Sequence, residues 1–189
     1  MKLLLVDHHS ELVRAWRRAF DDIADAEVIE GDYFARAADA MVSPANSFGI
    51  MDGGLDAAIR DTLGFEVQRR VQRAITERHH GELPVGCAEI VVTDDARWPH
   101  LVAAPTMRVP ESVAHTLNAY LALRAALLAC ARHGGIASLV CCGLGTGIGG
   151  MPAERCAVQM RMAWRHATGP ARIPSFAQIH AVHEALRRS

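Results

Sequence analysis

Two glycine-rich segments have residue types and spacing that suit anion binding. The first covers residues 43–54 (SPANSFGIMDGG) and the second covers residues 143–150 (GLGTGIGG). Glycine lets the backbone come close to a ligand, and the amide groups at the start of a following helix favour negative charge. In the second segment, four glycines at alternate positions leave the intervening amides free to converge on an anion. Two such loops facing each other would hold a diphosphate without any lysine.

Either segment alone also fits a tight strand-to-helix turn that binds no ligand. Two other phosphate-binding motifs fit the sequence less well. The single lysine, Lys2, lies far along the chain from both segments, so the pattern of a P-loop nucleotidase is missing. Residues 145–150 satisfy G-x-G-x-x-G formally. The acidic residue expected ~20 positions later is absent and no βαβ unit follows, which argues against a dinucleotide-binding Rossmann domain.

The composition indicates a globular domain without a strong electric field of its own. Half of the 189 residues are hydrophobic, and the formal net charge is -1. Such a chain has no general attraction to nucleic acid or to an anionic membrane, so any anion must be held locally by loops and helix ends. The N-terminal apolar run is too short for a signal peptide, and no run approaches the ~20 residues that span a bilayer. A cytoplasmic location is therefore expected.

The cysteines and histidines give no sign of a metal site or a cofactor. The five cysteines form no CxxC pair and lie in apolar runs, which is typical of buried thiols in a reducing compartment. Of the ten histidines, His8-His9 and His79-His80 are adjacent pairs, and this spacing does not place two ligands on one helix face. We therefore predict no metal site and no cofactor.

The elements that must position the two loops follow from hydrophobic periodicity. Strands are predicted at residues 3–6, 26–29, 40–42, 88–93, 101–104 and 136–142. Helices are predicted at residues 10–20, 55–64, 67–78, 112–133, 152–167 and 177–187. Strands interleaved with helices indicate an α/β fold in which a mostly parallel sheet is covered on both faces. In such sheets ligands bind at the carboxyl ends of strands, which is where both glycine-rich segments lie.

Five short motifs, in order and with matching spacing, resemble the macro domain family over about residues 26–168. They are residues 31–32 (GD), 43–46 (SPAN), 52–56 (DGGLD), 83–86 (LPVG) with Thr93, and 145–152 (GTGIGGMP). They resemble the family segments Gly-Asp-Ile-Thr, Asn-Ala-Ala-Asn, Gly-Gly-Gly-Val-Asp, Pro-x-Gly…Thr and Ser-Thr-Gly-Ile-Phe-Gly-Tyr-Pro. The resemblance implies one three-layer α/β/α domain over residues 1–189 with a central mixed, mostly parallel sheet.

The family's final strand is poorly represented in this chain. We therefore expect the N-terminal strand and helix, within residues 1–25, to supply a replacement edge of the sheet. Residues 169–189 are expected to form a C-terminal helical segment.

The resemblance also implies an ADP-ribose cleft and a role for each motif residue. Asp32 would bind the adenine amino group, Asn46 would contact the distal ribose, and Asp56 would orient or activate a water. The remaining ligand-binding residues lie in the two glycine-rich segments: Gly53, Gly54, Leu55, Gly145, Thr146, Gly147, Ile148 and Gly149. The residue types also fit plainer roles, because Asp32 and Asn46 suit turns and Asp56 suits the first turn of a helix.

Two positions depart from the family pattern. Asp52 stands where the family has its first glycine and would put a carboxylate near the anion loop. Gly149 replaces an aromatic residue that often covers the distal ribose, which predicts a more open cleft at that point.

Two classes of function follow from the resemblance. The first is a hydrolase that removes ADP-ribose from a modified macromolecule or a small derivative such as ADP-ribose 1''-phosphate, with Asn46 and Asp56 as its catalytic residues. The second is a reader module that binds ADP-ribose without turnover. Asp56 at the matching position favours hydrolysis. The expected partner is ADP-ribose or an ADP-ribosylated substrate, and nucleic acid would bind only when it carries the modification.

Overall fold

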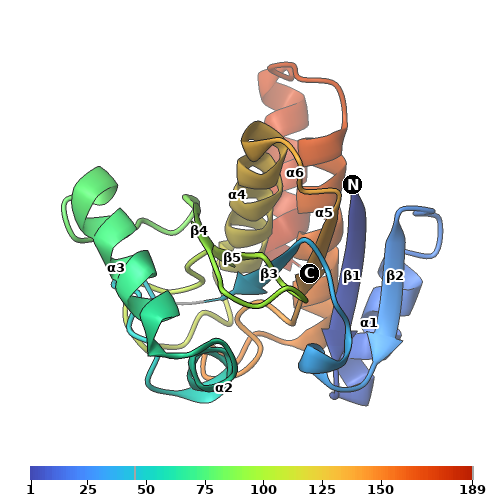
Figure 1. Ribbon diagram of the computed structural model, residues 1–189. Coiled ribbons are helices and arrows are strands. Elements are labelled where there is room, and N and C mark those ends of the chain that lie inside the picture. Colours follow the sequence, from blue (N-terminus) through green and yellow to red (C-terminus); the bar gives the residue numbers. More distant parts are fainter. Residues whose placement is uncertain (45, 189) are drawn as a thin grey trace.

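The computed structural model describes residues 1–44 and 46–188, and a six-stranded sheet forms its centre (Figure 1). The strand order is β2-β1-β6-β3-β5-β4. The strands are β1 (Lys2–Asp7), β2 (Ala26–Glu30), β3 (Ala40–Ser43), β4 (Glu89–Val92), β5 (His100–Ala103) and β6 (Ser138–Cys141). Of these described strands, β4 runs antiparallel to β5 and the other neighbours are parallel. The predicted mixed, mostly parallel sheet is therefore confirmed.

Helices cover both faces of this sheet. They are α1 (Ser10–Ala19), α2 (Gly54–Leu63), α3 (Phe65–His79), α4 (Asn118–His133), α5 (Ala153–Thr168) and α6 (Phe176–Arg188), with a short 3-10 helix η1 (Tyr33–Ala35). Helix α5 packs between α1 and α4, whereas α2 and α3 pack together near β3 and β4 (Figure 1). The fold is the expected three-layer α/β/α arrangement. Within the described chain, no helix is long and apolar enough to cross a membrane.

The N-terminal strand β1 lies inside the sheet, so the expectation that it forms an edge is wrong. It pairs with β2 on one side and with β6 on the other, and β2 is the outer strand. The sequence explains the order, since the run Leu3–Val6 is apolar at every position and buried, as a strand covered on both faces requires. The half-exposed Ala26–Glu30 contains two glutamates and suits an edge. As a result, Asp7 at the end of β1 lies next to the end of β6.

Helix α4 starts at Asn118, six residues later than the periodicity predicts. The segment before it is held by tertiary hydrogen bonds instead of helical ones. The Val113 amide donates to the Gly149 carbonyl at 2.8 Å, and the Asn118 side-chain amide donates to the Thr106 carbonyl at 2.7 Å. The Val113 bond fixes the segment against the second glycine-rich loop, and the Asn118 bond ties the start of α4 back to Thr106, which is why the segment leaves the helical path.

Tyr33 joins the ends of two neighbouring strands. Its buried hydroxyl lies 2.7 Å from the Val42 carbonyl oxygen of β3 and 3.1 Å from the Val140 carbonyl oxygen of β6. Burial raises the pKa of Tyr33 well above its usual value, so the hydroxyl keeps its proton and donates it to the carbonyls. Both strands end at the loops discussed below, so this contact helps to fix their spacing.

Replacing Tyr33 with Phe should lower the free energy of unfolding by about 1–2 kcal/mol, because it leaves buried carbonyl oxygens without their donor. Urea denaturation measures the change. Tyr120→Phe is the matched control, because its partly exposed hydroxyl faces His166 at 3.0 Å and its loss should cost less than about 0.5 kcal/mol. Equal losses in the two variants would contradict the bridging role of Tyr33.

Candidate functional site

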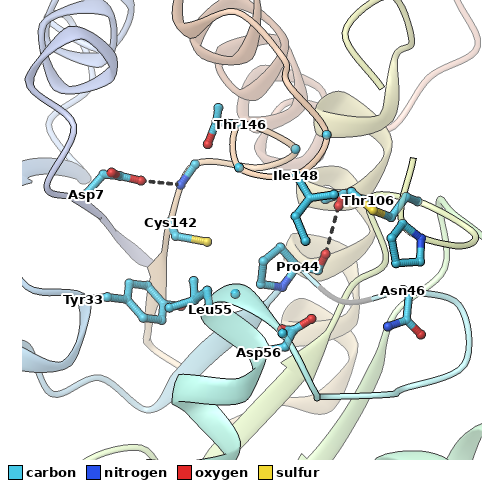
Figure 2. Close-up of a pocket in the computed structure, with 18 of the residues that line it drawn as sticks. Asp7, Tyr33, Pro44, Asn46, Leu55, Asp56, Thr106, Cys142, Thr146 and Ile148 are labelled. Carbon is cyan, nitrogen blue, oxygen red and sulfur yellow. Dashed lines mark hydrogen bonds between the residues drawn. The ribbon is translucent and has the colours of Figure 1, made fainter. Parts of the chain in front are cut away.

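A cavity of about 290 Å³ lies at the carboxyl ends of the parallel strands (Figure 2). Its wall is built from the segments at the ends of five strands, with His8 after β1, Gly31 after β2, Pro44 after β3, Thr106 after β5 and Gly143 after β6. This is the edge at which a parallel sheet presents ligand sites. Both glycine-rich loops predicted to bind an anion contribute to the same cavity.

The first loop brings the start of α2 to the cavity. Gly53, Gly54, Leu55 and Asp56 all line it. Gly53 is the N-cap residue and provides no side-chain cap, so the first-turn amides of α2 have no partner from a capping side chain. A Cβ atom on Gly53 or Gly54 would meet no atom within 4 Å. The helix end is therefore open to a ligand on this side.

The second loop contains glycines of two kinds. A Cβ atom at Gly145 would lie 2.9 Å from Val113 Cγ2, and one at Gly149 would lie 2.5 Å from the same atom. Packing therefore requires glycine at both positions. Gly147 differs, because a Cβ atom there would meet nothing within 4 Å and its backbone is not left-handed. The fold does not need glycine at Gly147, which lines the cavity.

The amides of this loop point to an anion site. Gly150 and Met151 donate within the loop, to the Gly147 and Gly145 carbonyls at 3.0 and 2.9 Å. The four backbone amides from Thr146 to Gly149 have no hydrogen-bond acceptor among the residues that the structure describes. They lie in a turn beside the cavity, where converging N–H groups can bind negative charge.

An apolar side chain extends over the cavity next to these amides. Ile148 is 64% exposed and lies above Pro44 in Figure 2. At the neighbouring Gly149, which lines the cavity, Val113 occupies the space that a Cβ atom would need. Ile148 is thus placed to cover an apolar part of a ligand.

Asp56 has an altered acidity. It sits in the first turn of α2, half-buried, and its carboxylate accepts a 2.6 Å hydrogen bond from the Ser43 hydroxyl at the end of β3. Burial raises the pKa of Asp56 to about 6, while the Ser43 hydrogen bond acts in the opposite direction. A carboxylate with this pKa exchanges protons readily near neutral pH and suits general base catalysis.

Asn46 lines the cavity, but its polar atoms are engaged in its own loop. Its Oδ1 accepts from the Phe48 and Ile50 amides at 3.0 and 3.3 Å, and its Nδ2 donates to the Ile50 carbonyl at 2.7 Å. Three of its four hydrogen-bonding positions are thus used to shape the loop. Ala45, in the same motif, lies outside the described residues.

Among the predicted site residues, Asp32 is the one that does not line the cavity. It is exposed, and its carboxylate accepts from the Phe34 amide at 3.0 Å as the N-cap of η1. Its neighbours Gly31 and Tyr33 do line the cavity. The other predicted residues are brought together there: Asn46, Gly53, Gly54, Leu55, Asp56, Gly145, Thr146, Gly147, Ile148 and Gly149.

The segment that follows β1 also lines the cavity, and sequence reasoning missed it. Asp7, His8 and His9 lie in the wall. The Asp7 carboxylate accepts from the Gly143 amide at 3.2 Å and from the His9 amide at 3.0 Å, and it lies 2.7 Å from the His9 ring nitrogen Nδ1. The usable signal was an aspartate at the carboxyl end of a buried strand. It carries weight only once β1 is known to lie beside β6.

The charges in the cavity are unusual for an anion site. Three carboxylates line it, those of Asp7, Asp52 and Asp56. Among the described lining residues there is no lysine or arginine, and His8 and His9 are the side chains able to carry positive charge. Backbone amides and the α2 terminus must therefore provide most of the attraction for an anion.

Comparisons of the sequence identify a family. A family model described as Macro domain matches residues 42–160. An uncharacterized protein of Aquifex aeolicus is 34% identical over 138 residues, which are 72% of this chain and 78% of that relative. An uncharacterized protein of Aeropyrum pernix is 33% identical over 135 residues, 70% of this chain and 67% of that relative.

Solved structures show the same fold. The macrodomain of Mycobacterium tuberculosis DarG matches with a TM-score of 0.59 at 24% identity, covering 72% of this chain and 88% of that one. A mutant Oceanobacillus iheyensis macrodomain with ADPR matches with a TM-score of 0.60 at 19% identity, covering 84% and 89%.

The raised pKa of Asp56 predicts how stability depends on pH. Because the folded-state pKa lies above the unfolded value of about 3.9, the native state binds the proton more tightly, and stability falls as pH rises from about 4 through 6. Asp56→Asn removes this loss. The variant should therefore gain about 2 kcal/mol relative to wild type between pH 4.5 and pH 7.5 in urea unfolding.

Asp52→Asn is the control, because Asp52 lines the same cavity but is exposed. Its stability difference from wild type should stay constant over this pH range. If the difference in unfolding free energy between Asp56→Asn and wild type also stayed constant, folding would not raise the pKa of Asp56.

Proposed function

The chain belongs to the macro domain family, and from this premise we propose that its cavity binds ADP-ribose and that Asp56 promotes hydrolysis of ADP-ribose from a modified substrate. The substrate would be a macromolecule or a small derivative such as ADP-ribose 1''-phosphate. The observation that carries the binding proposal is that the amides from Thr146 to Gly149, which donate no hydrogen bond to the described residues, line the same cavity as the open N-terminus of α2. A diphosphate between them meets donors on both sides.

The order of the strand ends suggests how the ligand lies. The second glycine-rich loop follows β6 at the middle of the cavity, with β1 and β2 on one side and β3 and β5 on the other. A diphosphate at this middle position would direct one end of the molecule toward Gly31 and Tyr33, and the other toward Asn46 and Thr106. By family resemblance, the first end would hold adenine and the second the distal ribose.

The hydrolytic step follows from Asp56. With a pKa near 6, its carboxylate is largely ionised at neutral pH and can take a proton from a water. The water oxygen would bond to the anomeric carbon of the distal ribose while the bond to the leaving group breaks, and the leaving group would gain the proton that Asp56 takes from the water. The Ser43 hydroxyl fixes the position of the Asp56 carboxylate, and the loop amides hold the diphosphate in register.

A reader without turnover is the second candidate, and one observation favours it. The polar atoms of Asn46 are engaged in holding the first loop instead of facing a ribose. If this arrangement persists with ligand bound, the distal ribose has fewer contacts to orient its anomeric carbon. Binding through the loop amides would then remain, and turnover would not.

Gly147→Val tests the binding site. Gly147 lines the cavity and a Cβ atom there would meet nothing within 4 Å, so thermal stability should stay close to wild type. It should lower ADP-ribose affinity at least about tenfold in calorimetry, because the loop amides lose their approach to the diphosphate. Gly145→Ala, in contrast, should lower thermal stability. Gly145 has a left-handed backbone, and a Cβ atom there would lie too close to Val113.

Wild-type calorimetry with ADP-ribose, ADP and NAD side by side completes this test. Preference for ADP-ribose is expected. Equal affinity for all three, or unchanged ADP-ribose affinity in Gly147→Val, would contradict the proposed site.

Asp56→Asn separates the hydrolase from the reader. Release of ADP-ribose from a modified substrate should fall at least about a hundredfold, because the general base is lost. Affinity for free ADP-ribose should change less than about tenfold, since the loop amides remain. Ester-linked, phosphate-linked and base-linked substrates should be assayed in parallel. If wild-type protein releases ADP-ribose from none of them, the reader function holds and the hydrolase proposal fails.

A further inference from the structure

Asp7, His8 and His9 form a cluster of metal-ligating groups at one end of the cavity. Each offers one ligand atom, and these atoms all lie within 4.8 Å of one another. Asp7 Oδ1 is 2.7 Å from His9 Nδ1 and 3.9 Å from His8 Nδ1. In a tetrahedral zinc site, with bonds of about 2.0–2.1 Å, neighbouring ligand atoms are about 3.3 Å apart. The measured separations lie on both sides of this value, so small ring rotations would suffice.

The three residues have the freedom and the support that such a site needs. The His8 and His9 side chains are 79% and 65% exposed, so their rings can turn without repacking the core. The Asp7 side chain is only 10% exposed and is held by the Gly143 and His9 amides. A fixed carboxylate with hydrogen-bonded oxygens, combined with two adjustable imidazoles, matches the ligand preferences of zinc.

A second observation is the charge balance of the cavity. If it binds a diphosphate, as the proposed function requires, the ligand's negative charges join three carboxylates, and no lysine or arginine among the described lining residues opposes them. Of these three carboxylates, that of Asp7 is hydrogen-bonded to the second loop, through the Gly143 amide. A cation held by Asp7 would offset this repulsion where the diphosphate is expected.

We propose that Asp7, His8 and His9 bind a divalent transition-metal ion, with Zn²⁺ as the best fit, beside the second glycine-rich loop. Two imidazoles and one carboxylate leave a coordination position open toward the cavity, as in zinc sites that keep a place for water or substrate. A diphosphate oxygen of the bound ligand would take this position. The metal site itself does not depend on the proposed function, whereas its contact with the diphosphate does.

The test begins with Zn²⁺ alone, titrated by calorimetry into the full chain after chelator treatment. One ion per chain should bind. His8→Ala/His9→Ala should weaken binding at least about a hundredfold, because removing even an outer-sphere partner costs 10- to 100-fold. Both side chains are exposed, so this variant should fold normally.

The other adjacent histidine pair provides the matched control. His79 lies 2.8 Å from Glu89, but the same carboxylate also pairs with Arg78 at 2.6 Å. His79→Ala/His80→Ala should therefore leave zinc binding unchanged. Cys87→Ser should also leave it unchanged, although Cys87 is an exposed thiol that could bind zinc on its own. Equal zinc affinity in wild type and His8→Ala/His9→Ala, or no binding tighter than about 100 μM in wild type, would overturn the proposal.

Ligand binding is measured last, with and without saturating Zn²⁺. ADP-ribose affinity should rise about tenfold with zinc in wild type and stay constant in His8→Ala/His9→Ala. If the protein does not bind zinc, and ADP-ribose binds equally well with and without the ion, the metal site is overturned and the proposed function stands. Zinc bound at the site of a protein that ignores ADP-ribose would support the metal site and overturn the proposed function.

Discussion

Any anion in this cavity has to be held mainly by backbone amides, since the described lining residues include no lysine or arginine. A backbone amide cannot move to meet its ligand as a long side chain can, so the path of each loop must be set by the rest of the fold. The second glycine-rich loop illustrates how this is done. The Gly143 amide is bound by Asp7 from β1, and the Gly149 carbonyl accepts from Val113. Between these two anchors, the amides from Thr146 to Gly149 are left for a ligand.

The same constraint explains the position of β1. Because it lies between β2 and β6, the carboxylate at its end reaches the start of the loop that follows β6. An edge position would have placed Asp7 at least one strand away, about 4.8 Å further along the sheet. The segment that joins β5 to α4 performs a similar task on the opposite side of the loop through Val113. Two segments that are far apart in sequence thus fix one short loop.

Local patterns predicted most of the fold, and tertiary contacts account for what they missed. The apolar run before residue 143 and the glycines after it were enough to place a strand and the loop that lines the cavity after it. The neighbours of β1 could not be derived, because an apolar run shows that a strand is buried but not which strands flank it. The start of α4 was missed because Asn118 and Val113 bond to residues that are distant in sequence. Asp32 and Asp7 both follow strands, and only the assembled sheet shows that Asp7 lines the cavity.

The acidity of Asp56 follows from the same architecture. A helix terminus that is open to an anion should stabilise a nearby carboxylate, yet the pKa of Asp56 is raised because burial outweighs the Ser43 hydrogen bond. A bound diphosphate would add negative charge close by and would raise that pKa further. A cation beside the second loop would oppose this effect and keep Asp56 ionised when ligand is present. A metal ion held by Asp7, His8 and His9 would therefore act electrostatically on Asp56, although these three residues lie at the end of β1 and Asp56 lies in the first turn of α2.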